Sequence, residues 1–231
     1  MELMLYAYNS LLQKAYIDIA TLEKTYIERE TKVGIQRIPI NQNNKFVSRI
    51  FSRGSWTNNG WFYGGFWQHL GRSYRKDIFI NNKPTIEVDS KGIHPSILSI
   101  NKGKASIVYE LDEVILPGLN KKQQTKALKL LILTALSASS KRQAYEAFRA
   151  SSDLPLKDRE LSKLINSFIE LNPHLADELF TAQLVNLMYQ DSLITEYVIK
   201  KFTYSDVPIL SVHDSFIVPV SYTHLTLPTK A

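Results

Sequence analysis

The spacing of hydrophobic positions near the N-terminus predicts a long helix. Between residues 3 and 30, apolar side chains recur every three or four positions, and charged residues occupy the opposite side of the helical projection. We therefore expect residues 1–45 to form an N-terminal helical segment. The apolar positions that carry this pattern are Leu5, Tyr8, Leu12, Ala15, Ile19, Leu22 and Tyr26.

Further along the chain the pattern changes from strand to helix and back to strand. Residues 84–89 are rich in β-branched side chains that alternate with polar ones, which predicts a short strand. Residues 208–219 predict two more short strands around a polar turn. This order predicts an α+β fold with a small antiparallel sheet. The intervening helices are predicted over 121–150, with an interruption near 137–140, and over 155–171 and 173–202.

The last twelve residues stand apart from this pattern. Val220–Ala231 reads VSYTHLTLPTKA, which resembles the translation of a sequencing adapter. We therefore expect the natural chain to continue beyond Pro219, and these residues carry none of the functional interpretation.

Composition excludes several classes of protein. With 44% hydrophobic and 22% charged residues among 231, the chain has the composition of a globular protein. The absence of cysteine excludes a disulfide scaffold, thiol chemistry and thiolate zinc sites, and suits a reducing compartment such as the cytoplasm. No apolar run approaches the roughly 20 residues that span a bilayer, so no membrane partner is expected.

Charge and aromatic residues are concentrated in one stretch. The net charge is +6, and residues 31–76 contain eight basic residues, nine aromatic residues and no acid. This combination is typical of a surface that binds a phosphate backbone and stacks bases. The alternative is a glycine-rich loop whose aromatic residues pack in the core. The basic residues are Lys32, Arg37, Lys45, Arg49, Arg53, Arg72, Arg75 and Lys76.

Two aspartates stand at the ends of predicted strands. Asp89 ends the first strand, and Asp214 lies in the turn between the two later ones. A carboxylate beside a buried strand is costly unless it is paired or binds a cation. Two strands of one sheet could bring these carboxylates together, where Mg²⁺ or Mn²⁺ would relieve their repulsion. The alternative is two unrelated acids that face solvent.

The residues around both aspartates resemble a known superfamily. Ser211–Val218 (SVHDSFIV) resembles motif C of family A DNA polymerases and single-subunit phage-type RNA polymerases. Thr85–Leu98 is similar to motif A, and Gly60–Leu70 followed by Arg75 resembles a segment upstream of it. The resemblance covers residues 46–219 and implies a polymerase-like palm with reduced helical fingers, as in compact polymerase-like proteins of phages or mobile elements.

The resemblance implies a template-directed nucleotidyltransferase, DNA polymerase-like, that acts in replication of a phage or mobile element. Asp89, Asp214 and the backbone carbonyl of Ser90 would hold two Mg²⁺ ions, with Mn²⁺ as an alternative, and His213 would position the primer terminus. A primer–template and nucleoside triphosphates would be the partners. We expect a monomer in the cytoplasm of a bacterial cell or a phage-infected host.

Other positions carry roles only through the same resemblance. Lys122, Lys126 and Lys129 share one face of the predicted motif B helix and would neutralise the incoming triphosphate, with the central Lys126 as the catalytic lysine; the alternative is a solvated basic face. His94 occupies the position where the DNA polymerases carry a glutamate that excludes the ribose 2′-hydroxyl. The residues expected to contact nucleic acid are Arg53, Tyr63, Gln68, Arg75 and Gln190.

Several positions depart from the family pattern. Trp61 and Ser96 stand where arginines are expected, and His94 replaces the sugar-selecting glutamate. Two other functions therefore stay open at this point. One is an RNA polymerase or primase of the same superfamily, and the other is a catalytically inert module that binds nucleic acid.

Overall fold

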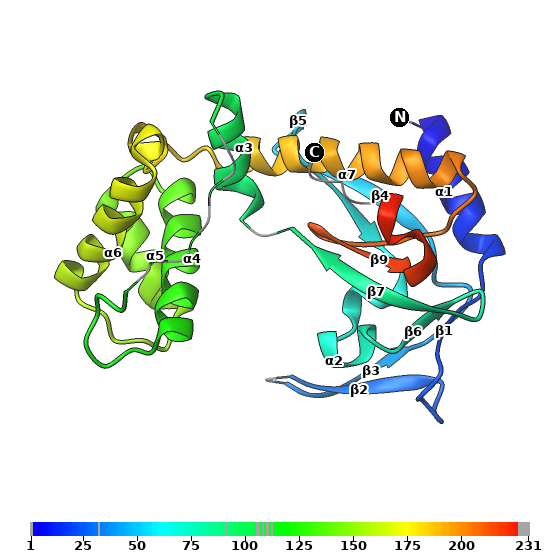
Figure 1. Ribbon diagram of the computed structural model, residues 1–231. Helices are drawn as coiled ribbons and strands as arrows, with labels where there is room; N and C mark the ends of the chain where they lie inside the picture. The colour runs from blue at the N-terminus through cyan, green and yellow to red at the C-terminus, as the bar shows by residue number, and fades with distance from the viewer. Residues whose placement is uncertain are drawn as a thin grey trace. The chain divides into compact units, whose positions relative to one another are not determined.

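The protein has an α+β fold composed of two compact units (Figure 1). The computed structural model describes residues 2–225 except 32, 91, 105, 106, 108, 110 and 112, and leaves the side chains of 223–225 undescribed. The first unit comprises Met1–Ser90 and Ser192–Ala231, and the second comprises Lys91–Asp191. Each unit has a hydrophobic core of its own. This division differs from the predicted one, which separated residues 1–45 from 46–219.

A five-stranded antiparallel sheet forms the centre of the first unit. Its strand order is β1-β6-β7-β9-β8, and every neighbouring pair is antiparallel. The strands predicted at 84–89 and around the polar turn are confirmed as β7, β8 and β9. The bounds are Ile17–Ile19 (β1), Ile78–Ile80 (β6), Lys83–Asp89 (β7), Leu210–Val212 (β8) and Ser215–Pro219 (β9).

Helices α1 (Glu2–Lys14) and α7 (Leu184–Tyr204) contribute to the core of this sheet. Tyr8 is fully buried, and its hydroxyl donates a hydrogen bond to the carbonyl of Ile209 at 2.9 Å. The 3₁₀ helix η1 (Phe66–His69) adds Trp67, whose indole N–H donates to the carbonyl of Ser211 at 3.0 Å. Both buried polar groups therefore have hydrogen-bond partners. These bonds attach α1 to Ile209, the residue before β8, and η1 to β8 itself.

The predicted N-terminal helix is much shorter than expected. It ends at Lys14, and the chain continues as β1, so the prediction of a helical segment over 1–45 was wrong. Ile17 and Ile19 are both buried and flank a partly exposed Asp18, which is the two-residue period of a strand paired with β6. Lys45 Nζ donates to the carbonyls of Gln13 (3.0 Å) and Ala15 (2.6 Å), so a buried lysine satisfies the carbonyls where this helix ends.

Two separate β-ribbons accompany the sheet in the first unit. Strand β2 (Tyr26–Thr31) pairs with β3 (Gly34–Pro39), and β4 (Val47–Ser52) pairs with β5 (Ser55–Gly64). The hydrophobic pattern predicted neither ribbon. At the tip of the second one, Arg53 and Gly54 have φ angles of 54° and 63°, as a type I′ turn requires. Strands β1, β2 and β3 therefore lie within the range where the N-terminal helical segment was predicted.

The second unit is helical in its described residues. The predicted interruption near 137–140 is confirmed, because α4 ends at Ser137 and α5 begins at Lys141. Helix α4 begins with a capping box in which the side chains of Asn120 and Gln123 each accept the other's backbone N–H at 2.9 Å. The elements are α3 (Ile93–Asn101), α4 (Lys121–Ser137), α5 (Lys141–Ser151), α6 (Asp158–Leu171), η2 (Pro173–Glu178) and the part of α7 up to Asp191.

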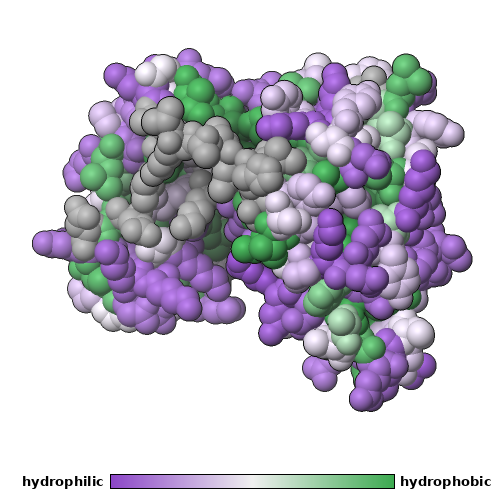
Figure 2. Space-filling view, turned by 45° about the vertical axis from the view of Figure 1, so that its right-hand side comes forward, coloured by the Kyte–Doolittle hydropathy of each residue, from purple (hydrophilic) through white to green (hydrophobic). Residues whose placement is uncertain are grey.

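Hydrophilic residues make up most of the coloured surface in Figure 2, and hydrophobic residues lie between them in smaller groups. Scattered apolar residues of this kind are normal on protein surfaces. Within the described part of the chain, no helix combines the length and the apolar character needed to cross a membrane.

Candidate functional site

Asp89 and Asp214 lie on neighbouring elements of the five-stranded sheet. Strand β7 lies beside β9 (Figure 1). Their register places Asp89 opposite Ser215, which directly follows Asp214. Asp214 belongs to the two-residue turn between β8 and β9, because Val212 pairs with Ser215. Asp89 is exposed and Asp214 is partly buried. The register therefore brings together two carboxylates that are far apart in sequence.

The electrostatics of Asp214 reflect this neighbourhood. Burial raises the pKa of the Asp214 carboxyl, and the negative charges of Asp89 and Glu87 raise it further. A backbone hydrogen bond and the nearby His213 oppose the shift without reversing it. The ionised form of Asp214 is therefore destabilised at this end of the sheet, and a cation placed beside it would relieve the repulsion.

The donor atoms at this position fit a hard divalent cation. The two carboxylates offer only oxygen, which Mg²⁺ prefers, and Mg²⁺ commonly keeps several water ligands beside one or two carboxylates. The backbone carbonyl of Ser90, the residue after Asp89, stays a predicted further ligand. Among the residues that the structure describes, three or more His, Cys, Asp or Glu side chains do not gather in a metal-binding group. A cation here would therefore depend on the aspartate pair, the carbonyl and water.

His213 adopts an unusual backbone conformation in the same turn. Its φ angle is 54°, which in the first position of a two-residue hairpin turn usually belongs to glycine. A non-glycine residue in this region costs about 1–3 kcal/mol, and such residues cluster at functional sites. The imidazole is exposed and contacts the rings of Trp61 and Tyr63, with centroid distances of 5.3 Å and 6.2 Å. The predicted site residues Tyr63 and His213 therefore lie together beside Asp214.

Arg75 forms its contacts inside the first unit. Its guanidinium binds both carboxylate oxygens of Glu87, at 3.2 Å and 2.8 Å, and donates to the carbonyl of Leu70 at 2.7 Å. Burial alone would raise the pKa of Glu87, but hydrogen bonds from Arg75 and Ser215 and the charge of Arg75 lower it overall. The Ser215 hydroxyl lies 3.0 Å from Glu87. This network ties β7 to β9 two residues from Asp89.

Gln68 also makes its hydrogen bonds within the first unit. Its side-chain amide donates to the carbonyls of Phe62 (3.0 Å) and Ser211 (2.8 Å), and its oxygen accepts from the N–H of Gly64 (3.1 Å). These bonds connect β5 with the β8–β9 hairpin. Arg53, in contrast, is exposed at the tip of the β4–β5 ribbon.

Three of the eight basic residues at 31–76 pair with acids from outside the stretch. Arg37 pairs with Glu28 at 3.2 Å, Arg49 pairs with Glu196, and Arg75 pairs with Glu87. Lys45 is buried at the end of α1, and Lys32 lies outside the described residues. The expectation of an uncompensated basic surface was therefore wrong for the three paired arginines and for the buried Lys45. Four basic residues of the stretch are exposed: Arg37, which pairs with Glu28, and Arg53, Arg72 and Lys76.

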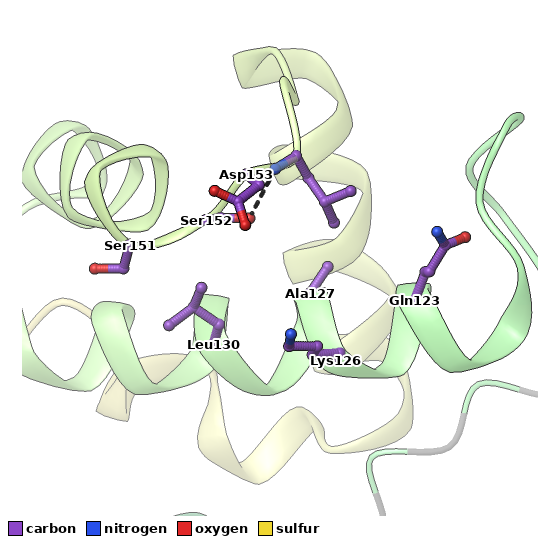
Figure 3. A pocket seen from close by; sticks show the side chains of 8 residues that line it. Gln123, Lys126, Ala127, Leu130, Ser151, Ser152 and Asp153 are labelled. Atoms are coloured by element: carbon purple, nitrogen blue, oxygen red, sulfur yellow. Dashed lines mark hydrogen bonds between the residues drawn. The ribbon is translucent and has the colours of Figure 1, made fainter. Parts of the chain in front are cut away.

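The predicted lysine face is present on α4 in the second unit. Lys122, Lys126 and Lys129 are all exposed, and Lys129 Nζ lies 5.8 Å from the centroid of the Tyr109 ring. Lys126 lines a pocket of about 220 Å³ between α4 and the segment that follows α5 (Figure 3). The pocket is lined by Gln123, Lys126, Ala127, Leu130, Ser151, Ser152, Asp153 and Leu154.

His94 and Gln190 also belong to the second unit. Burial lowers the pKa of His94, and its Nε2 atom lies 3.8 Å from a carboxylate oxygen of Asp191. Gln190 donates to Asn186 at 2.8 Å and accepts from Asn101 at 3.1 Å. His94 and Gln190 therefore each contact other polar side chains of the second unit.

The sequence pattern did not predict the ion pairs of the first unit. The pairing of Arg49 with Glu196 and of Arg75 with Glu87 left no local signal, because each partner lies on a different element.

Comparisons of the chain with protein-family models, with curated proteins and with solved structures find no match. The resemblance to polymerases therefore stays a prediction.

Proposed function

We propose that this protein is a template-directed nucleotidyltransferase of the DNA polymerase type, with Asp89 and Asp214 as its metal-binding carboxylates. The observation that carries the proposal is the β7–β9 register, which places both aspartates at the same end of the sheet. Burial and, to a smaller extent, repulsion from Asp89 raise the pKa of Asp214, which supports the proposal because a divalent cation would stabilise the ionised pair. The polymerase-like sequence motifs around both residues indicate the reaction class.

The chain's own groups have distinct tasks in this proposal. Asp89, Asp214 and the Ser90 carbonyl hold two Mg²⁺ ions, or Mn²⁺ in their place. Bound there, the ions supply Lewis-acid stabilisation of the attacking and leaving oxygens of an in-line phosphoryl displacement. His213 orients the primer terminus next to Asp214. The lysine face of α4, with Lys126 at its centre, is the proposed contact for triphosphate.

Primer extension with Mg²⁺ tests this proposal directly. Wild type, Asp89→Asn and Asp214→Asn are compared on a labelled primer–template with all four dNTPs. Each variant keeps the side-chain shape and removes one charge, so we expect each to lose about 100-fold or more in rate. Asp206→Asn is the matched control, because Asp206 is exposed and its φ of 57° suits asparagine equally well.

The outcomes separate the possible reaction types. Activity undiminished in both aspartate variants would overturn the assignment. Extension with NTPs in place of dNTPs would identify an RNA polymerase or primase instead. Binding of the primer–template without extension under any divalent cation would identify a catalytically inert binding module.

A further inference from the structure

A β-bulge interrupts β5 three residues before Tyr63. Ile50 pairs with Trp61 and Phe51 pairs with Asn59, so Gly60 is an extra residue in β5. Gly60 has a φ of 84°, and a Cβ at this position would lie 2.8 Å from Ser192 Oγ and 3.0 Å from the Phe51 ring. Bulges change the direction of the side chains that follow them and are common beside functional sites.

Arg49 fixes this bulge from within. Its Nε donates to the carbonyl of Gly60 at 2.7 Å, and its other nitrogens bind Glu196 and Ser192 Oγ on α7. The guanidinium also lies 5.0 Å and 5.3 Å from the ring centroids of Phe51 and Phe62. Only 3% of the Arg49 side chain is exposed, so a buried cation with three hydrogen bonds holds the bulge in place.

The residues after the bulge fall into two classes. Trp61 and Tyr63 are two positions apart and share one face of β5, whereas Phe62 between them is 3% exposed. Phe66 and Trp67, slightly further along, are fully buried. Trp61 and Tyr63 instead stay partly exposed and contact the exposed His213 ring. The aromatic residues of this segment therefore do not all serve the core.

The rings of Trp61 and Tyr63 are both inclined to the His213 imidazole. The Trp61 and His213 planes meet at 53°, and the Tyr63 and His213 planes meet at 76°, so neither aromatic ring covers the imidazole in a parallel stack. The next residue after His213 is Asp214, whose carboxylate belongs to the candidate metal site. A flat heteroaromatic group beside these rings would lie at the same end of the sheet as the aspartates.

We propose that Trp61 and Tyr63, together with His213, form a stacking site for a nucleobase of the bound nucleic acid strand. This inference rests on the proposed function, because it takes the ligand beside the aspartates to be nucleic acid. Stacking on aromatic side chains tolerates every base, so the site would hold the strand without reading its sequence. Trp61 occupies the position where the resembling family carries arginine, so a ring would replace a charge there.

An abasic substitution tests the stacking directly. Affinity for a fluorescently labelled primer–template is measured by anisotropy in EDTA and without nucleotide, so that turnover does not contribute. Single abasic sites are placed at the primer terminus, at the penultimate primer position and at the templating position. We expect one of the three to weaken binding to wild type about 10-fold, the scale of one base–aromatic contact.

The protein variants complete a double-mutant cycle with these substrates. Trp61→Ala should bind the intact substrate about 10-fold more weakly and lose little more with the abasic substrate, because the partner ring is already gone. Trp61→Phe should keep most of the wild-type behaviour, since it retains an aromatic ring and loses the second ring of the indole, whose N–H has no hydrogen-bond partner among the described residues. Trp56→Ala is the matched control, because Trp56 is 73% exposed on the same ribbon and makes its ring contact with Phe51.

Equal losses from each abasic site in wild type and in Trp61→Ala would overturn the inference. Tyr63→Leu provides a second variant, and thermal melting of every variant verifies that the fold is retained. The result is independent of the proposed catalysis. If the abasic and Trp61→Ala losses are not additive and Asp89→Asn leaves extension unchanged, the stacking site is kept and the catalytic carboxylates are rejected. Additive losses together with a loss of extension in Asp89→Asn would keep the catalytic carboxylates and reject the stacking site.

Discussion

The two candidate functional surfaces of this protein are built in opposite ways. The aspartate end of the sheet combines β7, the β8–β9 turn and, through the aromatic contacts, β5. The lysine face of α4 comes from one continuous helix with regular spacing. The first surface contains His213 with a positive φ angle and the Asp214 carboxyl with a raised pKa, and the buried Arg49 lies on the neighbouring ribbon. The second surface consists of exposed lysines. The energetically unfavourable features of the two candidate surfaces are therefore concentrated in the first unit.

Removing a large side chain from the helical core should have the largest effect on stability. Leu164 is fully buried in the second unit, and Leu164→Ala should cost about 3 to 5 kcal/mol through lost contacts and a cavity. All three tryptophans lie in the first unit. Urea unfolding followed by helical circular dichroism should therefore shift more than unfolding followed by tryptophan fluorescence. Equal shifts of both signals would show that the two cores unfold as one.

Removing the buried guanidinium should weaken the first unit. Arg49→Met leaves the Gly60 carbonyl and the Glu196 carboxylate without their donor, which in a fully buried pair costs about 3 to 5 kcal/mol. Glu196 is a quarter exposed, so we expect about 2 kcal/mol, measured by urea unfolding with tryptophan fluorescence. Arg37→Met is the control, because the Arg37–Glu28 pair is exposed and should contribute less than about 1 kcal/mol. Similar losses in both variants would contradict the contrast between buried and exposed pairs.

Neutralising Asp214 should stabilise the protein slightly. The folded state raises the pKa of this carboxyl, so the folded protein binds more protons than the unfolded chain between the two pKa values. The stability contribution of Asp214 therefore falls as pH rises through the unfolded pKa towards the folded one. Asp214→Asn should raise the free energy of unfolding at pH 7 by up to about 1 kcal/mol, since partial exposure limits the effect. The gain should vanish near pH 3, and a loss at pH 7 would contradict the raised pKa.

Changing the lysine face should have the smallest effect on stability. Lys126→Gln removes an exposed charge and should alter the free energy of unfolding by less than about 0.5 kcal/mol. Under the proposed function the same change should raise the KM for nucleotide severalfold. Lys200→Gln, on an exposed position of α7, is the matched control for a general charge effect. An equal change in KM for both variants would assign the effect to net charge alone.

Elements with a local signal were predictable, and elements made by pairing were not. The strand at 84–89, the hairpin around His213 and Asp214, and the start of α4 all follow from spacing, turn residues or a capping box. The N-terminal helix was overextended because Ile19, Leu22 and Tyr26 continue the helical spacing of α1 by coincidence. Burial of Ile17 and Ile19 against β6 decided in favour of a strand. The basic stretch was misjudged because its acidic partners lie elsewhere in the sequence.

The sequence alone determined that Asp89 ends a strand, that Asp214 lies in a tight turn and that three lysines share a helix face. Each of these is a property of neighbouring residues, which short-range backbone preferences control. Only the tertiary structure decided that β7 pairs with β9 in the register that joins the two aspartates. Tertiary structure also decided that Arg75 pairs with Glu87 and that Arg49 pairs with Glu196. Strand pairing and burial between distant segments are cooperative, and the local pattern of a strand does not specify its partner.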